Sequence, residues 1–215
     1  MFEDRKDAGQ RLARALKEYK DKNVLVLGIP RGGVEVGYYV ASALHADFSM
    51  VISRKLPLPD DPEAGFGAIA EDGSTFLIER AAGWVAEEEI ETIKEAQRRE
   101  IARRIRILRK GRPLPDLKGR TVILVDDGIA MGATMRVAIM LCRGKKAKEV
   151  MVAVPVASPD IADEMREITN RFIALETPAF FRAVAQVYRH WQDVPDAEVL
   201  AIMDRWDKKN SEAQP

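Results

Sequence analysis

Two adjacent acids, Asp126 and Asp127, follow a run of apolar and β-branched residues at 121–125 and precede a loop of small residues at 128–134. The run has the composition of a strand that is covered on both faces, as strands of parallel sheets are. Ligands of open α/β sheets bind at the carboxyl ends of such strands. Carboxylates at this place can serve hydroxyl groups or a metal ion, although a solvated acid pair at a strand end is the structural alternative.

The loop at 128–134 contains Gly128 and Gly132 and leads into an expected helix that includes residues 135–141. A loop that turns from strand to helix directs backbone N–H groups and the positive end of the helix dipole at one point. The sequence therefore predicts a phosphate site beside the two acids.

A second glycine-rich loop, GIPRGG at 28–33, has the same plan, because an expected strand at 24–27 precedes it and an expected helix at 34–44 follows. Its spacing is not a dinucleotide fingerprint. Arg31 lies among residues that let the backbone approach a ligand closely, so it is placed to contact an anion. The alternative is a tight turn that needs glycine.

A third strand is expected at 48–53, with Arg54 and Lys55 at its carboxyl end. The stretch 56–67 combines proline, glycine and acids, which is typical of an irregular loop; it either orders over a ligand or is a plain solvated connection. Two short β-patterns around Asp72-Gly73 then predict a hairpin.

One long helix is expected at 85–109, with an apolar stripe, acids in its first turns and bases in its last, as the helix dipole favours. The segment 98–112 carries eight basic residues and one acid. Nucleic-acid binding is a competing interpretation of that segment, but no aromatic residues interleave for base stacking.

Further on, a strand at 150–154, a helix at 158–167 capped by Ser158, a strand at 171–175 and a helix at 196–206 are expected. The alternation predicts an α/β fold, a mainly parallel twisted sheet with helices on both faces. We expect one domain over 1–207 and assign its parts as follows: an inserted helix at 84–112, a C-terminal hood and helix at 177–206, and a disordered tail at 208–215.

The composition excludes several classes of protein. Lys plus Arg equals Asp plus Glu at 34 each, so no global field favours nucleic acid or an acidic membrane. The single cysteine, Cys142, excludes an internal disulfide and is expected to be a buried thiol. No apolar run approaches the roughly 20 residues of a membrane span. We expect a cytoplasmic protein with no membrane association.

The segment Val122–Thr134 resembles the phosphoribosyl pyrophosphate signature of the type I phosphoribosyltransferases. GIPRGG resembles the family's pyrophosphate loop, and Arg54-Lys55 with the residues that follow resembles its second strand and mobile flap. The stretch 2–203 is similar to the "predicted phosphoribosyltransferase" branch, with GIPRGG, GFGAIAEDG and DDGIAMGATM in order.

The resemblance implies transfer of ribose 5-phosphate from phosphoribosyl pyrophosphate to a nitrogenous base or related acceptor, with release of pyrophosphate. It implies Mg²⁺ held by Asp126 and Asp127, a small-molecule acceptor and a homodimer. Asp126, Asp127, Arg31 and Lys55 would be catalytic. The residues implied to bind the donor are Ile29, Pro30, Arg31, Gly32, Gly33, Arg54, Lys55, Asp126, Asp127, Gly128, Ile129, Ala130, Met131, Gly132, Ala133 and Thr134. A regulatory protein that binds the donor or a nucleotide without turnover is the alternative.

Two residues depart from the family pattern. Met131 stands where most members have Thr or Ser, which removes one hydroxyl donor to the phosphate and weakens binding by roughly 1–3 kcal/mol. Ala130 stands where the 6-oxopurine enzymes have an aspartate base, which counts against that class of acceptor. We expect Asp127→Asn to abolish activity and leave the fold intact. Four aromatic residues form either an acceptor-binding hood or core: Phe180, Phe181, Tyr188 and Trp191.

Overall fold

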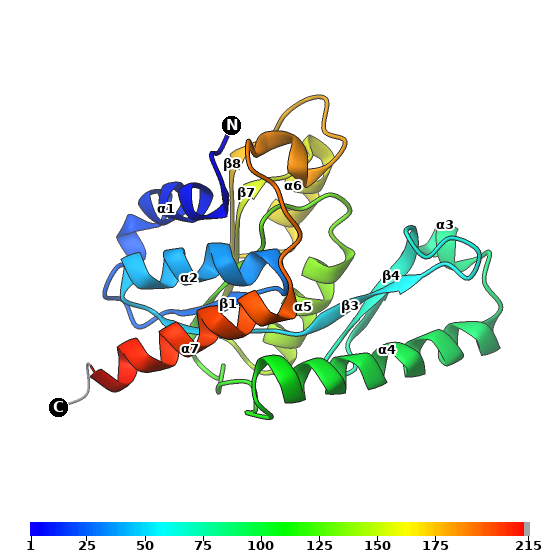
Figure 1. Cartoon of the computed structure of the whole chain (residues 1–215). Coiled ribbons are helices and arrows are strands. Elements are labelled where there is room, and N and C mark those ends of the chain that lie inside the picture. Colours follow the sequence, from blue (N-terminus) through cyan, green and yellow to red (C-terminus); the bar gives the residue numbers. More distant parts are fainter. Residues whose placement is uncertain (213–215) are drawn as a thin grey trace.

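A five-stranded parallel sheet forms the centre of the protein, whose computed structural model describes residues 1–212 (Figure 1). The strand order is β2-β1-β6-β7-β8. The bounds are β1 (Leu25–Gly28), β2 (Asp47–Met50), β6 (Thr121–Val125), β7 (Glu149–Val156) and β8 (Arg171–Glu176). Because β1 and β6 are neighbours, with Gly28 paired to Val125, the two glycine-rich loops that follow them meet at one edge of the sheet.

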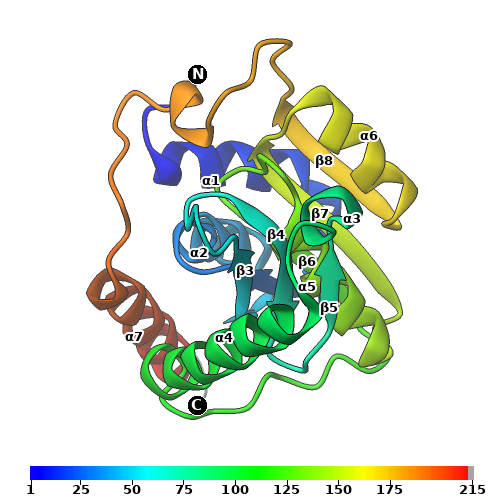
Figure 2. The same ribbon diagram turned by 90° about the vertical axis from the view of Figure 1, so that its right-hand side faces the viewer.

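Helices cover both faces of this sheet, as the sequence predicts (Figures 1 and 2). α1 (Arg5–Ala15), α2 (Gly32–Leu44) and α7 (Asp196–Glu212) lie on one face, and α5 (Ala133–Gly144) and α6 (Pro159–Glu167) lie on the other. Alternate strand residues serve the two faces: Val26 and Ile123 pack in the first core, while Leu25 and Leu124 pack in the second. The predicted α/β fold class is confirmed. The expected buried thiol is confirmed too, since Cys142 is fully buried, and this burial raises its pKa to about 12.

An arm, defined here as residues 53–108, projects from the carboxyl edge of the central sheet (Figure 1). It contains a three-stranded antiparallel sheet in the order β3-β4-β5 and the long helix α4 (Glu87–Leu108), which runs beneath it. The remaining bounds are β3 (Ser53–Pro57), β4 (Gly65–Ala70), β5 (Thr75–Leu77), α3 (Glu79–Ala82), and the 3-10 helices η1 (Lys17–Tyr19) and η2 (Val184–Val187). The predicted hairpin and the predicted long helix are both confirmed.

The single strand expected at 48–53 is wrong. The chain leaves the central sheet after Met50, and β3 begins at Ser53 in the arm, so Arg54 and Lys55 lie within β3 rather than at the end of β2. Met50, Val51 and Ile52 are all fully buried, with Met50 and Ile52 packed in the first core and Val51 in the second. A continuous apolar run therefore hides the change of sheet.

The irregular loop expected at 56–67 is shorter in the structure. Residues 56–57 belong to β3 and 65–67 to β4, which leaves 58–64 as the connection. Leu58 donates to the carbonyl of Ala64 at 3.2 Å, and the Asp61 carboxylate accepts from the Glu63 amide at 3.1 Å, so the turn is internally bonded. Pro57 is tolerated because β3 is an edge strand.

The final helix is longer than predicted. α7 continues to Glu212, so 208–212 are helical instead of a disordered tail, and the rest of that predicted tail, 213–215, lies outside the described residues. The helix is anchored by Trp206, which is buried edge-on against Phe48 of β2. Within residues 1–212, no helix has the length and apolar character that crossing a membrane requires.

A buried ion pair joins the base of the arm to the central sheet. Arg109 donates to both carboxylate oxygens of Glu71, at 2.9 and 2.5 Å, and to the Met50 carbonyl at 3.2 Å. Glu71 also accepts from the Ile52 amide at 3.0 Å. The pair therefore fixes the segment where the chain crosses between the two sheets.

Glu71→Gln is expected to lower the free energy of unfolding by about 2 kcal/mol, because Arg109 would keep a hydrogen bond but lose its counter-charge in a buried place. Urea denaturation measures the change. Asp204→Asn is the control, since its pair with Lys110 is half exposed and contributes little. Equal effects of the two substitutions would show that the buried pair does not stabilise the arm.

Candidate active site

A cavity of about 250 Å³ lies at the carboxyl end of β6, between the central sheet and the arm. One wall is the acid and loop segment predicted from the sequence, and Lys55 of β3 faces it from the arm. The cavity is lined by Lys55, Gly65, Gly67, Ile78, Asp126, Gly128, Ile129, Ala130, Met131, Gly132, Ala133, Thr134, Met135 and Val184. The structure thus brings Asp126, Lys55 and the whole 128–134 loop together.

The loop at 128–134 ends in the first turn of α5, as predicted. Gly132 is the N-cap residue and has φ +76°, a left-handed conformation that side chains other than glycine rarely adopt. The first amides of a helix have no partners within it, so those of α5 are available beside the cavity. An anionic group bound here would lie at the positive end of a helix of 12 residues.

The GIPRGG loop packs directly on the two acids. A β-carbon on Gly32 would lie 1.8 Å from Asp127 Oδ2, and one on Gly33 would lie 2.6 Å from the Val125 carbonyl oxygen and 2.8 Å from the Asp126 Cα. Glycine is therefore required at both positions for the close approach of two backbone segments.

Gly33→Ala is expected to separate the two loops and weaken binding of any ligand that spans them by at least about 10-fold, roughly 1.4 kcal/mol. Calorimetric titration with phosphoribosyl pyrophosphate, the ligand that the sequence resemblance implies, measures this. Gly144→Ala is the matched control, because no atom lies within 4 Å of the added methyl group. Unchanged affinity in the Gly33 variant would contradict the required contact.

Asp127 is held by Arg5, a residue that the sequence analysis missed. Arg5 Nε donates to Asp127 Oδ2 at 2.8 Å, and its NH1 donates to the Gln192 carbonyl at 2.8 Å. The guanidinium also lies over the Trp191 ring, 4.0 Å from its centroid. The sequence shows that residue 5 is a cation but not what it contacts. Its partner, Asp127, is 122 residues away, and a local sequence pattern cannot reveal a pair at that separation.

The two acids face different surroundings. Asp126 lines the cavity, and its Oδ1 accepts the Asp127 amide at 2.8 Å, whereas the Asp127 carboxylate is turned toward Arg5 and Gly32. Burial and then the neighbouring charge of Asp127 raise the pKa of Asp126 well above its ordinary value. Burial also raises the pKa of Asp127, and Arg5 opposes that rise. Of the two, Asp126 is the carboxylate that a ligand in the cavity meets.

The three predicted basic residues take separate positions. Lys55 lines the cavity, and its ammonium donates to the Glu63 carbonyl of the turn at 58–64. Arg31 lies at the start of α2, 3.9 Å from the Asp196 carboxylate. Arg54 faces α4, where its Nε donates to Gln97 at 3.0 Å. Lys55 and Arg54 diverge because neighbouring residues of a strand point to opposite faces.

The four aromatic residues of the predicted hood lie in different environments. All four are within the described part of the chain, and none of them lines the cavity. Tyr188 is buried between Phe2 and Trp191, and its hydroxyl donates to the Asp127 carbonyl at 2.7 Å. Phe180 is 89% exposed. Tyr188 is therefore a core residue, which was the alternative to a role in an acceptor-binding hood. Within the segment 180–191, Val184 is the residue that lines the cavity.

A family model described as "Phosphoribosyl transferase domain" matches residues 2–188, which contain both loops and the cavity. The chain belongs to the phosphoribosyl transferase family. Two proteins of Mycobacterium tuberculosis, from strains CDC 1551 / Oshkosh and ATCC 25618 / H37Rv, are each named "Putative phosphoribosyl transferase". Each is 40% identical to this chain over 216 residues, covering 99% of this chain and 48% of its own length.

The crystal structure of TT1426 from Thermus thermophilus is similar throughout, with 37% identity and a TM-score of 0.80, over 96% of this chain and 99% of that one. The arm and the central sheet are thus shared with a relative of nearly equal length. By contrast, the chain spans about half the length of the curated relatives it matches.

Proposed function

We propose that this phosphoribosyl transferase moves ribose 5-phosphate from phosphoribosyl pyrophosphate to a nitrogen nucleophile of a base or related acceptor. The observation that carries the proposal is the meeting of two glycine-rich loops on either side of Asp126 and Asp127, next to a cavity that Lys55 also lines. One loop suits a phosphate, the other suits a second anionic group, and the acids between them suit the hydroxyls of a sugar.

Each part of the donor has a matching surface. The amides at the start of α5, with the Thr134 hydroxyl, would hold the 5-phosphate. Asp126 would accept hydrogen bonds from the ribose hydroxyls. Arg31, with the amides of Gly32 and Gly33, and Lys55 would bind the pyrophosphate. Met131, whose side chain is 64% exposed, leaves the loop amides free to bind phosphate, and its thioether offers no donor.

The residues present fit a magnesium ion that is shared with the donor. Among residues 1–212 no group of three or more His, Cys, Asp or Glu side chains could enclose a metal. Asp126 could supply a carboxylate ligand from the cavity, whereas the Asp127 carboxylate is bonded to Arg5. Mg²⁺ usually takes one or two carboxylates from a protein when phosphate oxygens complete its shell. When bound, the ion would neutralise charge on the diphosphate.

The transfer breaks the bond from the ribose anomeric carbon to pyrophosphate oxygen and forms a bond from that carbon to the acceptor nitrogen. The electron pair of the broken bond leaves with pyrophosphate, and the acceptor nitrogen loses its proton to solvent or to the leaving group. Positive charge develops on the sugar, so Asp126 would stabilise it, while Arg31 and Lys55 would stabilise the leaving group. Ala130 supplies no base, so the acceptor is one that needs none there.

The proposal is tested by calorimetric titration with phosphoribosyl pyrophosphate and Mg²⁺, followed by a screen of bases and amines for pyrophosphate release. Binding with acceptor-dependent release supports transfer. No binding at millimolar donor would exclude the proposal, and binding without release by any acceptor would favour a regulatory donor-binding protein.

A further inference from the structure

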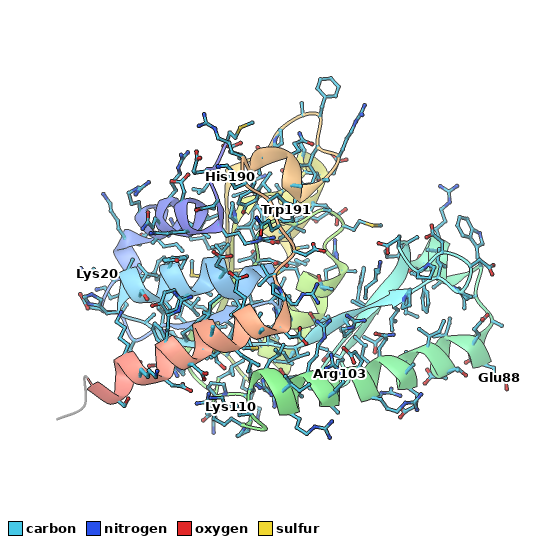
Figure 3. The ribbon with its side chains drawn as sticks, in the orientation of Figure 1. Lys20, Glu88, Arg103, Lys110, His190 and Trp191 are labelled. Carbon is cyan, nitrogen blue, oxygen red and sulfur yellow. The ribbon has the colours of Figure 1, made fainter. Side chains whose placement is uncertain are left out.

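Four arginines from three segments gather where α4 passes the first turn of α7: Arg31, Arg54, Arg103 and Arg104. We call them the arginine cluster. Arg31 belongs to the GIPRGG loop and Arg54 to β3, and α4 supplies the other two. Asp196 of α7 connects two of them, because its carboxylate lies 3.9 Å from Arg31 NH1 and 3.6 Å from Arg103 NH2. Figure 3 shows Arg103 in this part of α4, with Glu88 at the far tip of the arm.

The cluster has more positive than negative charge. Glu100 accepts from Arg103 Nε at 2.7 Å and from Arg104 Nε at 3.0 Å, and Asp196 serves Arg103 and Arg31. Across the described chain these are the carboxylates within 4.0 Å of the cluster, so four guanidinium groups meet two carboxylates. Burial, and next the charge of Arg104, lower the pKa of Arg54. An anion would relieve this mutual repulsion.

The cluster also has donors without partners. Arg54 and Arg104 use only their Nε atoms in hydrogen bonds to side chains, to Gln97 and Glu100, and their terminal nitrogens bond to no protein atom within residues 1–212. Arg104 is held in place because its side chain is only 10% exposed, and Arg54 is held by its hydrogen bond to Gln97. Guanidinium forks that are fixed in this way match the paired oxygens of phosphate groups.

We propose that α4 and β3 complete a binding subsite for a diphosphate, in which Arg104, Arg103 and Arg54 extend the anion site begun by Arg31. The ligand class is inorganic pyrophosphate or the diphosphate of the donor, so this inference rests on the proposed function. A nucleic acid fits less well, because several other basic residues of α4 already have carboxylate partners within the protein: Lys94 with Glu91, and Arg98 and Arg99 with Glu95.

Calorimetry with two separate probes tests the subsite, using pyrophosphate with Mg²⁺ and ribose 5-phosphate. Arg54→Gln and Arg104→Gln are each expected to weaken pyrophosphate binding by about 10-fold and to leave ribose 5-phosphate binding unchanged, because the latter is held at the start of α5. Arg54→Lys should recover only part of the affinity, since an ammonium group restores the charge but not the guanidinium fork. Arg99→Gln is the matched control on the same helix, and it should change neither affinity.

The outcomes separate this inference from the proposed function. Wild-type affinity for pyrophosphate in both glutamine variants would overturn the subsite and leave the transferase intact. Equal losses for both probes would also overturn it, because they would indicate a disturbed fold. If the wild-type protein binds neither probe nor the donor, the proposed function and the subsite fail together.

Discussion

Asp126→Asn is expected to lower kcat/KM for phosphoribosyl pyrophosphate by about 10²- to 10³-fold, the usual cost of removing one electrostatic contact to a transition state. Asp126 is the acid that lines the cavity, and its Oδ1 is fixed by the Asp127 amide. Asparagine keeps that hydrogen bond, because its carbonyl oxygen can still accept it. The variant loses the negative charge that would stabilise the sugar, and with it one acceptor oxygen and the carboxylate ligand for Mg²⁺.

The same substitution is expected to stabilise the unliganded, metal-free protein. The pKa of Asp126 is raised above its ordinary 3.8, mainly by burial, so the folded protein binds this proton more tightly than the unfolded chain does. Stability that the protonated carboxyl supplies at low pH is therefore lost as the pH rises from about 4 through the folded pKa. Asparagine cannot ionise, so the free energy of unfolding of the variant should exceed that of the wild type by an amount that grows over that pH range.

Thermal unfolding of the wild type and the variant between pH 4 and 8, in the presence of a chelator, measures this difference in stability. Initial rates of pyrophosphate release measure activity. Asp127→Asn is the informative comparison, because it removes the partner of the buried Arg5 and should destabilise the protein. That result would change the sequence-based expectation of an intact fold for this variant. A stable but fully active Asp126→Asn protein would rule out the assigned role of Asp126.

The central sheet and its two loops could be predicted from the sequence because their signals are local. Residues 122–125 are fully buried, and Gly132 has the positive φ that its loop needs. The long α4 was predicted for the same reason, since its dipole-ordered charges and apolar stripe lie within one segment. Family membership followed from short segments in a fixed order.

Features that depend on distant parts of the chain could not be predicted. The change from the central sheet to the arm occurs inside a uniformly buried stretch at 50–52, where no polar residue marks it. The position of α4 near Arg31, with Asp196 between Arg31 and Arg103, depends on how the arm packs against the central sheet. The sequence of the helix alone does not indicate that packing. Arg5 reads as one more charge at the start of an amphipathic helix until the fold brings Asp127 to it.

Arg5→Met is expected to lower kcat/KM by about 10²-fold and the free energy of unfolding by about 3 kcal/mol, because it leaves the Asp127 carboxylate buried without a counter-charge. Methionine approximates the length and apolar contact of the side chain over Trp191. Arg5→Lys should recover part of both losses, since an ammonium group restores the charge but not the fork that joins Asp127 to the Gln192 carbonyl.

A double-mutant cycle with Asp127→Asn decides whether Arg5 acts through Asp127. If it does, Arg5→Met in the Asp127→Asn background should lower the free energy of unfolding much less than in the wild type, because the buried charge that Arg5 balances is already gone. The rates should be measured at a temperature where every variant is folded, as checked by circular dichroism. Additive losses would show that Arg5 supports the N-terminal segment alone and has no part in positioning Asp127.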